Sequence, residues 1–176
     1  MLVQAVAAQN NANVAQNAAV EQRVPKAWEG DHSFLVDFSA PSIHTTGDIQ
    51  IESVGPGAMF NQTSPWNWLM RCYDSSYISI NVNLTKKEAQ KDWNLGLSQF
   101  ASQGPAPNGQ RGYSPISIEI NGKTIEPRFL SQVNAWREDF FPVQLHEGEN
   151  SIVIRLLDDA TTNYCIQKLW LDPVSE

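Results

Sequence analysis

The segment SPISIEINGK, residues 114–123, decides the fold. Its three isoleucines alternate with polar residues, which is the period-2 pattern of a strand with one buried face. The Asn121-Gly122 pair that follows them predicts a type I′ turn, because both central residues of that turn need a positive φ. Residues 123–126 would then form the returning strand of a β-hairpin.

The same alternation recurs on both sides of this hairpin. Turn-forming residues separate the segments, among them Gly55-Pro56-Gly57 and the polar run at 147–150. About eight or nine short strands with turns between them are typical of an all-β fold, a single antiparallel β-sandwich or jelly roll. The other predicted strands are residues 34–38, 49–51, 66–73, 77–84, 141–145, 152–156 and 164–171.

The N-terminal segment differs from the rest of the 176-residue chain. We divide the chain into residues 1–25, rich in Ala, Gln and Asn and stopped by Pro25, and a β-sandwich domain of residues 26–176. The segment is expected to be an exposed helix or a linker. Two alternatives stay open: a helix packed on the sandwich or on a protein partner, and a shortened secretion signal ending at residues 5–8.

Charge and hydropathy exclude two kinds of partner. The net charge of −7 argues against nucleic acid and anionic membranes, because phosphate binding depends on Lys and Arg. No apolar run reaches the length of a membrane span, so no membrane insertion is expected.

An insertion from residue 85 to residue 112 interrupts the strand pattern. Thr85 and Glu88 have the spacing of a capping box, which predicts a short helix from Lys86 to about Trp93. Residues 102–112 form a loop rich in Gly, Pro and polar residues, and loops of this length are usually functional or disordered.

The two cysteines are expected to face the core. Cys72 shares an apolar phase with Trp68 and Met70, and Cys165 shares one with Leu169. They would be either two buried free thiols or a Cys72–Cys165 disulfide within the core. Two cysteines and three scattered histidines do not suggest a metal site.

Residues 113–171 carry a resemblance to a known family. The runs SPISIEINGK, FPVQLHEGENSIVIRL and IQKLWL resemble the C-terminal half of galactose-binding-like β-sandwich domains, which include many carbohydrate-binding modules. In those domains the Asn-Gly hairpin and the Gly-x-Asn turn are structural, so Asn121, Gly122, Gly148 and Asn150 are expected to be scaffold. Residues 1–25 and 85–112 have no counterpart in the family.

The resemblance implies a function and a location. It implies a glycan partner and a non-catalytic accessory domain of a secreted or cell-surface protein that acts on polysaccharides. It also permits a structural Ca²⁺, for which Asp158 and Asp159 are the main candidates and Asp31 and Asp172 further ones. No other cofactor is expected.

A glycan site needs an exposed aromatic ring for the apolar face of a sugar, with amide or charged groups beside it. The chain has six tryptophans. Trp136 is the best single platform, because it is expected in an irregular segment between strands. The candidate ligand-binding residues are Trp66, Arg111, Asn134, Trp136, Arg137, Asp159 and Asn163.

Catalysis is not expected. No nucleophile elbow and no metal-spaced histidine pair occur, and Asp158 and Asp159 are neighbours, whereas a glycosidase needs two carboxylates facing across a cleft. The alternative function is a structural or protein-interaction module of a larger extracellular assembly, with residues 1–25 contacting the partner.

Overall fold

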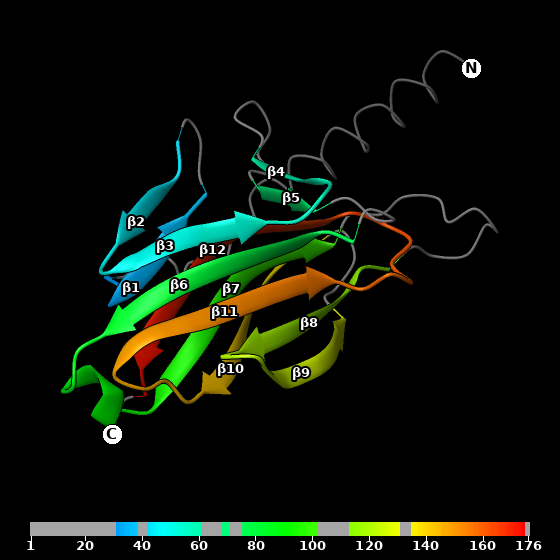
Figure 1. Cartoon of the computed structure of the whole chain (residues 1–176). Coiled ribbons are helices and arrows are strands. Elements are labelled where there is room, and N and C mark those ends of the chain that lie inside the picture. Colours follow the sequence, from blue (N-terminus) through cyan, green and yellow to red (C-terminus); the bar gives the residue numbers. More distant parts are fainter. Residues whose placement is uncertain are drawn as a thin grey trace, which may run out of the picture.

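A computed structural model describes residues 31–38, 42–60, 68–70, 75–101, 113–130 and 135–174 (Figure 1). The predictions for residues 1–25, Trp66, Cys72, Arg111 and Asn134 lie outside these ranges. Within them the regular structure is almost entirely β, and no described helix is long and apolar enough to span a membrane.

The described elements are twelve strands and one short 3₁₀ helix. The strands are β1 (Phe34–Asp37), β2 (His44–Thr46), β3 (Ile49–Val54), β4 (Ala58–Phe60), β5 (Trp68–Met70), β6 (Tyr77–Leu84), β7 (Trp93–Ala101), β8 (Pro115–Ile120), β9 (Lys123–Leu130), β10 (Trp136–Val143), β11 (Gly148–Leu156) and β12 (Tyr164–Pro173).

These strands form two antiparallel sheets, which confirms the predicted β-sandwich. One sheet has five strands in the order β3-β6-β11-β8-β9. The other has seven, with the path β10-β7-β12-β1-β2 and with β4 and β5 attached beside β12. Figure 1 shows the five-stranded sheet lying across the seven-stranded one. The edge strands β9 and β10 lie on the same side of the sandwich, because Phe129 of β9 and Phe141 of β10 meet edge to face with ring centroids 5.1 Å apart.

Isoleucine rows fill the core from the five-stranded sheet. Ile152 of β11 pairs with Ile80 of β6 on one side and with Ile120 of β8 on the other. Residues directly opposite one another point to the same face of a sheet, so the three side chains form one buried row. Fully burying one such side chain contributes about 1.5–3 kcal/mol, so these rows are a main reason why the alternating sequence adopts this fold.

The predicted hairpin at Asn121-Gly122 is confirmed. Asn121 has a φ of 52° and Gly122 a φ of 75°, the positive values that the turn requires. The returning strand β9 is longer than predicted, since it continues to Leu130.

The helix predicted after Thr85 is shorter than expected. Thr85 and Glu88 form the capping pair. The Thr85 hydroxyl and the Thr85 amide each donate to Glu88 Oε2 at 2.7 Å, and these bonds hold the pKa of Glu88 below its usual range. The 3₁₀ helix spans only Glu88–Gln90. Trp93, predicted as the end of the helix, instead begins β7, where it lies opposite Val143 of β10 and its side chain is buried.

A β-bulge in β12 corrects the prediction for Cys165. The register shifts between Ile166 and Lys168, so Cys165 lies opposite Phe100 and on the other face from Leu169. Cys165 is buried but does not belong to the core cluster between the sheets. It is a free thiol rather than half of a bridge to Cys72, and burial raises its pKa to about 12.

Candidate functional site

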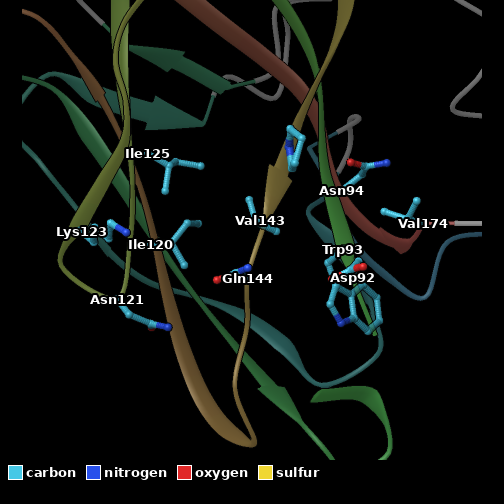
Figure 2. A pocket seen from close by; sticks show the side chains of 11 residues that line it. Asp92, Trp93, Asn94, Ile120, Asn121, Lys123, Ile125, Val143, Gln144 and Val174 are labelled. Atoms are coloured by element: carbon cyan, nitrogen blue, oxygen red, sulfur yellow. The ribbon is translucent and has the colours of Figure 1, made fainter. Parts of the chain in front are cut away.

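A groove lies at the β9–β10 side of the sandwich (Figure 2). We call it the edge groove. It has a volume of about 810 Å³ and runs from the β8–β9 hairpin across the end of β10 to the start of β7. Its lining residues are Asp92, Trp93, Asn94, Ile120, Asn121, Lys123, Ile125, Pro142, Val143, Gln144 and Val174.

The floor of the edge groove is apolar. Ile120 and Val143 are almost fully buried core residues at the ends of β8 and β10, and Ile125 is half buried on β9. Pro142, which alternates with the buried Phe141 and Val143 along β10, adds an exposed ring to the lining. Because β9 and β10 are edge strands of different sheets, the side chains between the sheets come to the surface here. The groove therefore offers aliphatic surface to a ligand.

The rim of the edge groove is polar. Lys123 stands on the hairpin side, Gln144 follows β10, and Asp92 and Asn94 flank the start of β7 (Figure 2). None of these four side chains makes a hydrogen bond or ion pair with another described residue. Two amides, a carboxylate and an ammonium together offer both donors and acceptors to a ligand.

Asn150 fixes the turn behind the groove. Its side chain is completely buried, and Nδ2 donates to the carbonyl oxygens of His146 at 2.8 Å and Gly148 at 3.0 Å. Oδ1 accepts from the His146 amide at 2.9 Å and from Asn121 Nδ2 at 2.9 Å. One side chain thus ties the turn between β10 and β11 to the β8–β9 hairpin. This agrees with the expectation that Asn121 and Asn150 are scaffold.

The hydrogen bonds of Asn150 and Asn121, which we call the asparagine clamp, also connect the two walls of the groove. Asn121 uses its Oδ1 to accept from the Ser151 amide at 2.8 Å, so its side chain is committed to the framework. Lys123 stands two residues beyond Asn121, and Gln144 stands two residues before His146. The hydrogen bonds of Asn121 and Asn150 therefore help to set the spacing between these two rim residues.

Trp93 supports the groove rather than offering a platform. It is only 1% exposed, its Nε1 donates to the carbonyl oxygen of Glu88 at 3.1 Å, and it packs against Phe34. A ligand in the groove would therefore rest on aliphatic side chains, not on an aromatic ring.

Trp136 does not lie in the irregular segment that the sequence predicted. It begins β10, is half buried and packs on Phe100 with ring centroids 5.4 Å apart. Neighbouring residues of a strand point to opposite faces, so Arg137 cannot stand beside Trp136 on one face of the sheet. The prediction that Trp136 lies in an irregular segment between strands is therefore wrong, and its part in glycan binding stays a prediction.

Arg137 is already engaged within the protein. Its guanidinium pairs with Asp139 at 2.8 Å, and Asp139 accepts from Gln99 Nε2 at 2.7 Å. Gln99 in turn accepts from the hydroxyl of the buried Tyr164. A continuous chain of hydrogen bonds thus runs from the core to Arg137.

The predicted acidic residues are also engaged. Arg128 donates to both carboxylate oxygens of Asp159, at 3.1 and 2.8 Å, and this guanidinium holds the pKa of Asp159 below its usual range. Asp158 accepts from Ser75 at 3.3 Å, and Asp172 pairs with His32 at 2.7 Å. In the described ranges no three Asp, Glu, His or Cys side chains gather closely enough to hold a metal, so the candidate calcium ligands are not brought together.

The described members of the predicted set lie at the opposite end of the sandwich from the edge groove. Trp136 begins β10, and Asn163, whose carbonyl oxygen accepts from Ser114, immediately precedes β12. The groove lies where β10 ends. A strand of 8 residues spans about 23 Å, so one ligand of ordinary size does not reach both places.

No pattern in the sequence marks the edge groove. Lys123 begins β9 and Gln144 follows β10, and both strands were predicted in part. The order of residues along the chain does not show, however, that β9 and β10 are edge strands on the same side of the sandwich. The available signal was the junction of each strand with its turn, where a polar residue follows an apolar one.

Comparisons with known proteins give likenesses of overall shape only. No family model and no curated protein matches the chain. A family 35 carbohydrate-binding module from Clostridium thermocellum is 19% identical, with a TM-score of 0.43 over 70% of this chain and 87% of that one. A family 36 module in complex with calcium and xylotriose is 16% identical, with a TM-score of 0.49 over 71% and 94% of the two chains.

A third solved structure is a family 36 domain of a multidomain xylanase from the hindgut metagenome of Trinervitermes trinervoides. It is 14% identical, with a TM-score of 0.49 over 73% of this chain and 99% of that one. Overlaps and identities of this size do not establish a shared family or a shared ligand.

Proposed function

We propose that this chain is a non-catalytic carbohydrate-binding module that holds its glycan in the edge groove. We further propose that it belongs to a secreted or cell-surface protein. The observation that carries the proposal is the composition of the groove, an aliphatic floor surrounded by four polar side chains without partners among the described residues.

A sugar ring matches this composition. Its C–H faces are apolar and would rest on Ile125 and Pro142, and its hydroxyl edges both donate and accept hydrogen bonds. Asn94 and Gln144 are suited to such edges because each amide also donates and accepts. The volume of about 810 Å³ falls within the roughly 300–1,000 Å³ of ordinary ligand sites.

The groove favours binding over hydrolysis. Cleavage of a glycosidic bond by the common mechanisms needs two carboxyl groups facing each other across the bond. Asp92 is the only carboxylate among the described lining residues.

The test is calorimetric titration of the wild type against a panel of soluble oligosaccharides. We expect weak, saturable binding of at least one of them. A hydrogen bond to a neutral group contributes about 0.5–1.5 kcal/mol, so Gln144→Ala and Asn94→Ala should each weaken binding by roughly 2- to 12-fold. Gln50→Ala, which removes an exposed amide from the outer face of the five-stranded sheet, is the matched control and should bind as the wild type does.

Trp136→Ala distinguishes binding in the edge groove from binding at the predicted site around Trp136. It should leave the affinity unchanged if the groove is the site. Loss of binding in this variant, with normal binding by Gln144→Ala and Asn94→Ala, would move the site to the other end of the sandwich. Failure of the wild type to bind any glycan would favour the protein-interaction module instead.

A further inference from the structure

Phe140 is an exposed aromatic side chain on the outer face of the seven-stranded sheet. Phe141 and Val143 of β10 point into the core, so Phe140 and Pro142, which alternate with them, point outward. Phe140 is 53% exposed. Among the Phe, Tyr and Trp side chains that the structure describes, it is the one that is exposed. Its ring therefore offers a large apolar surface to a ligand.

A buried tryptophan holds Phe140 in place. Phe140 lies directly opposite Gly96 of β7, and Gly96 lies opposite Trp170 of β12. Because Gly96 has no side chain, the indole of Trp170 lies against its backbone, where a Cβ would be 2.1 Å from Trp170 Cε2. The indole meets the ring of Phe140 edge to face, with ring centroids 5.8 Å apart.

Trp170 is itself fixed from its other side. It is 2% exposed, yet it does not belong to the core cluster between the sheets. His32 packs on it with ring centroids 5.0 Å apart, and Asp172 pairs with His32 at 2.7 Å. These contacts restrict the positions open to the Phe140 ring. A ligand that binds there meets a surface that is already ordered, which lowers the entropy lost on binding.

Phe140 adjoins the edge groove. Pro142 and Asn94 line the groove and lie directly opposite each other (Figure 2). Both side chains point to the same outer face as Phe140, because Val143 and Leu95 beside them point into the core. Two residues along a strand span about 6.6–6.8 Å, a distance comparable with the length of one sugar residue. Phe140 therefore stands about one sugar residue beyond this part of the groove.

We propose that Phe140 is a second sugar subsite, so that the protein binds a glycan chain of several residues rather than a single terminal sugar. The inference rests on the proposed function, because it extends the glycan site of the edge groove. One sugar ring contacts Pro142 and Asn94 in the groove, and the next ring places its C–H face on Phe140. The side chain of Phe140 has no polar atom, so this subsite selects a sugar that presents an apolar face.

The size of the surface favours a glycan over a protein partner. A stable protein interface buries about 800 Å² on each side and has a continuous apolar centre. Phe140 is instead a single ring with Pro142 and the amide of Asn94 beside it. This combination of one apolar surface and one hydrogen-bonding group matches a sugar ring, whose faces are apolar and whose edge is polar.

The test compares short and long glycans. Di- to hexasaccharides of β-linked xylose and glucose are titrated into the ¹⁵N-labelled full chain, and the amide shifts give the dissociation constants. The wild type should bind the longer members more tightly than the disaccharide. Phe140→Ala should bind the disaccharide as the wild type does and lose about tenfold in affinity for the hexasaccharide, as expected for an aromatic anchor.

Three further variants separate ring stacking from other effects. Phe140→Leu keeps an apolar contact with Trp170 but removes the ring, and it should show the same loss for the hexasaccharide. Phe140→Trp should keep the wild-type affinity, because it keeps a ring at this position. Leu130→Ala is the matched control: it removes an apolar side chain that is 54% exposed, at the end of β9, and should bind as the wild type does.

Failure of the second subsite is distinguishable from failure of the proposed function. If Phe140→Ala and Phe140→Leu bind the hexasaccharide as tightly as the wild type while Gln144→Ala binds it more weakly, the subsite is wrong and the edge groove stands. An equal loss for the disaccharide and the hexasaccharide also overturns the subsite, because Phe140 would not act on a second sugar. If the wild type binds no member of either series, both proposals are overturned.

Discussion

Replacing Asn150 with alanine tests how much the hydrogen bonds of this side chain contribute to the free energy of unfolding. The change removes four hydrogen bonds made by a side chain with no exposed surface. Each bond to a neutral group contributes about 0.5–1.5 kcal/mol, and partners that reach water again recover part of this. We expect the free energy of unfolding to fall by about 2–4 kcal/mol.

Urea denaturation followed by tryptophan fluorescence measures this loss. For a chain of this size a loss of 1 kcal/mol lowers the Tm by about 2–4 °C, so a fall of roughly 4–16 °C is expected in a parallel thermal melt. Asn94→Ala is the matched control, since its amide makes no hydrogen bond with the described residues, and it should stay within about 0.5 kcal/mol of the wild type. A loss below about 1 kcal/mol for Asn150→Ala would refute the view that this residue ties the two turns together.

Three further changes have outcomes that the structure determines. Gly96→Ala should lower the free energy of unfolding, measured by urea denaturation, by about 3 kcal/mol or more, because the new Cβ would lie 2.1 Å from Trp170 Cε2. Asp159→Asn should change stability little at neutral pH, since its ion pair with Arg128 is half exposed. Because that pair lowers the pKa of Asp159, its contribution is present above the unfolded-state pKa and disappears as the pH falls, so the two stability curves should converge in acid. Cys165 should resist alkylation at pH 8 in the native state, as peptide mass spectrometry would show, because it is buried and burial raises its pKa to about 12.

The fold could be predicted from the sequence because local patterns determine it. The alternation in residues 116–120 and the Asn121-Gly122 pair specify a strand and its turn without reference to the rest of the chain. The bulge in β12 was not predictable in this way. It inserts one residue between Ile166 and Lys168, which reverses the face to which the preceding residues of the strand point. Cys165 therefore does not face the core between the sheets, as the alternation had predicted.

The site was harder to predict because it depends on contacts between distant segments. Trp136 looked exposed beside polar neighbours, but pairing with Phe100 placed it in a strand and half buried it. Arg137 and Asp159 looked available, but each has an ionic partner that only the folded chain brings close. The edge groove arises where two edge strands of different sheets meet, which no local pattern encodes.

The location of a bound glycan tests the central claim most directly. Once the panel has identified an oligosaccharide that binds, its titration into ¹⁵N-labelled protein reports the residues whose amide resonances shift. We predict that Lys123, Gln144 and Asn94 shift together, with the same saturation curve, and that Trp136 and Asp159 do not. Shifts confined to the end of the sandwich that carries Trp136 and Asp159, with none around the edge groove, would contradict the account.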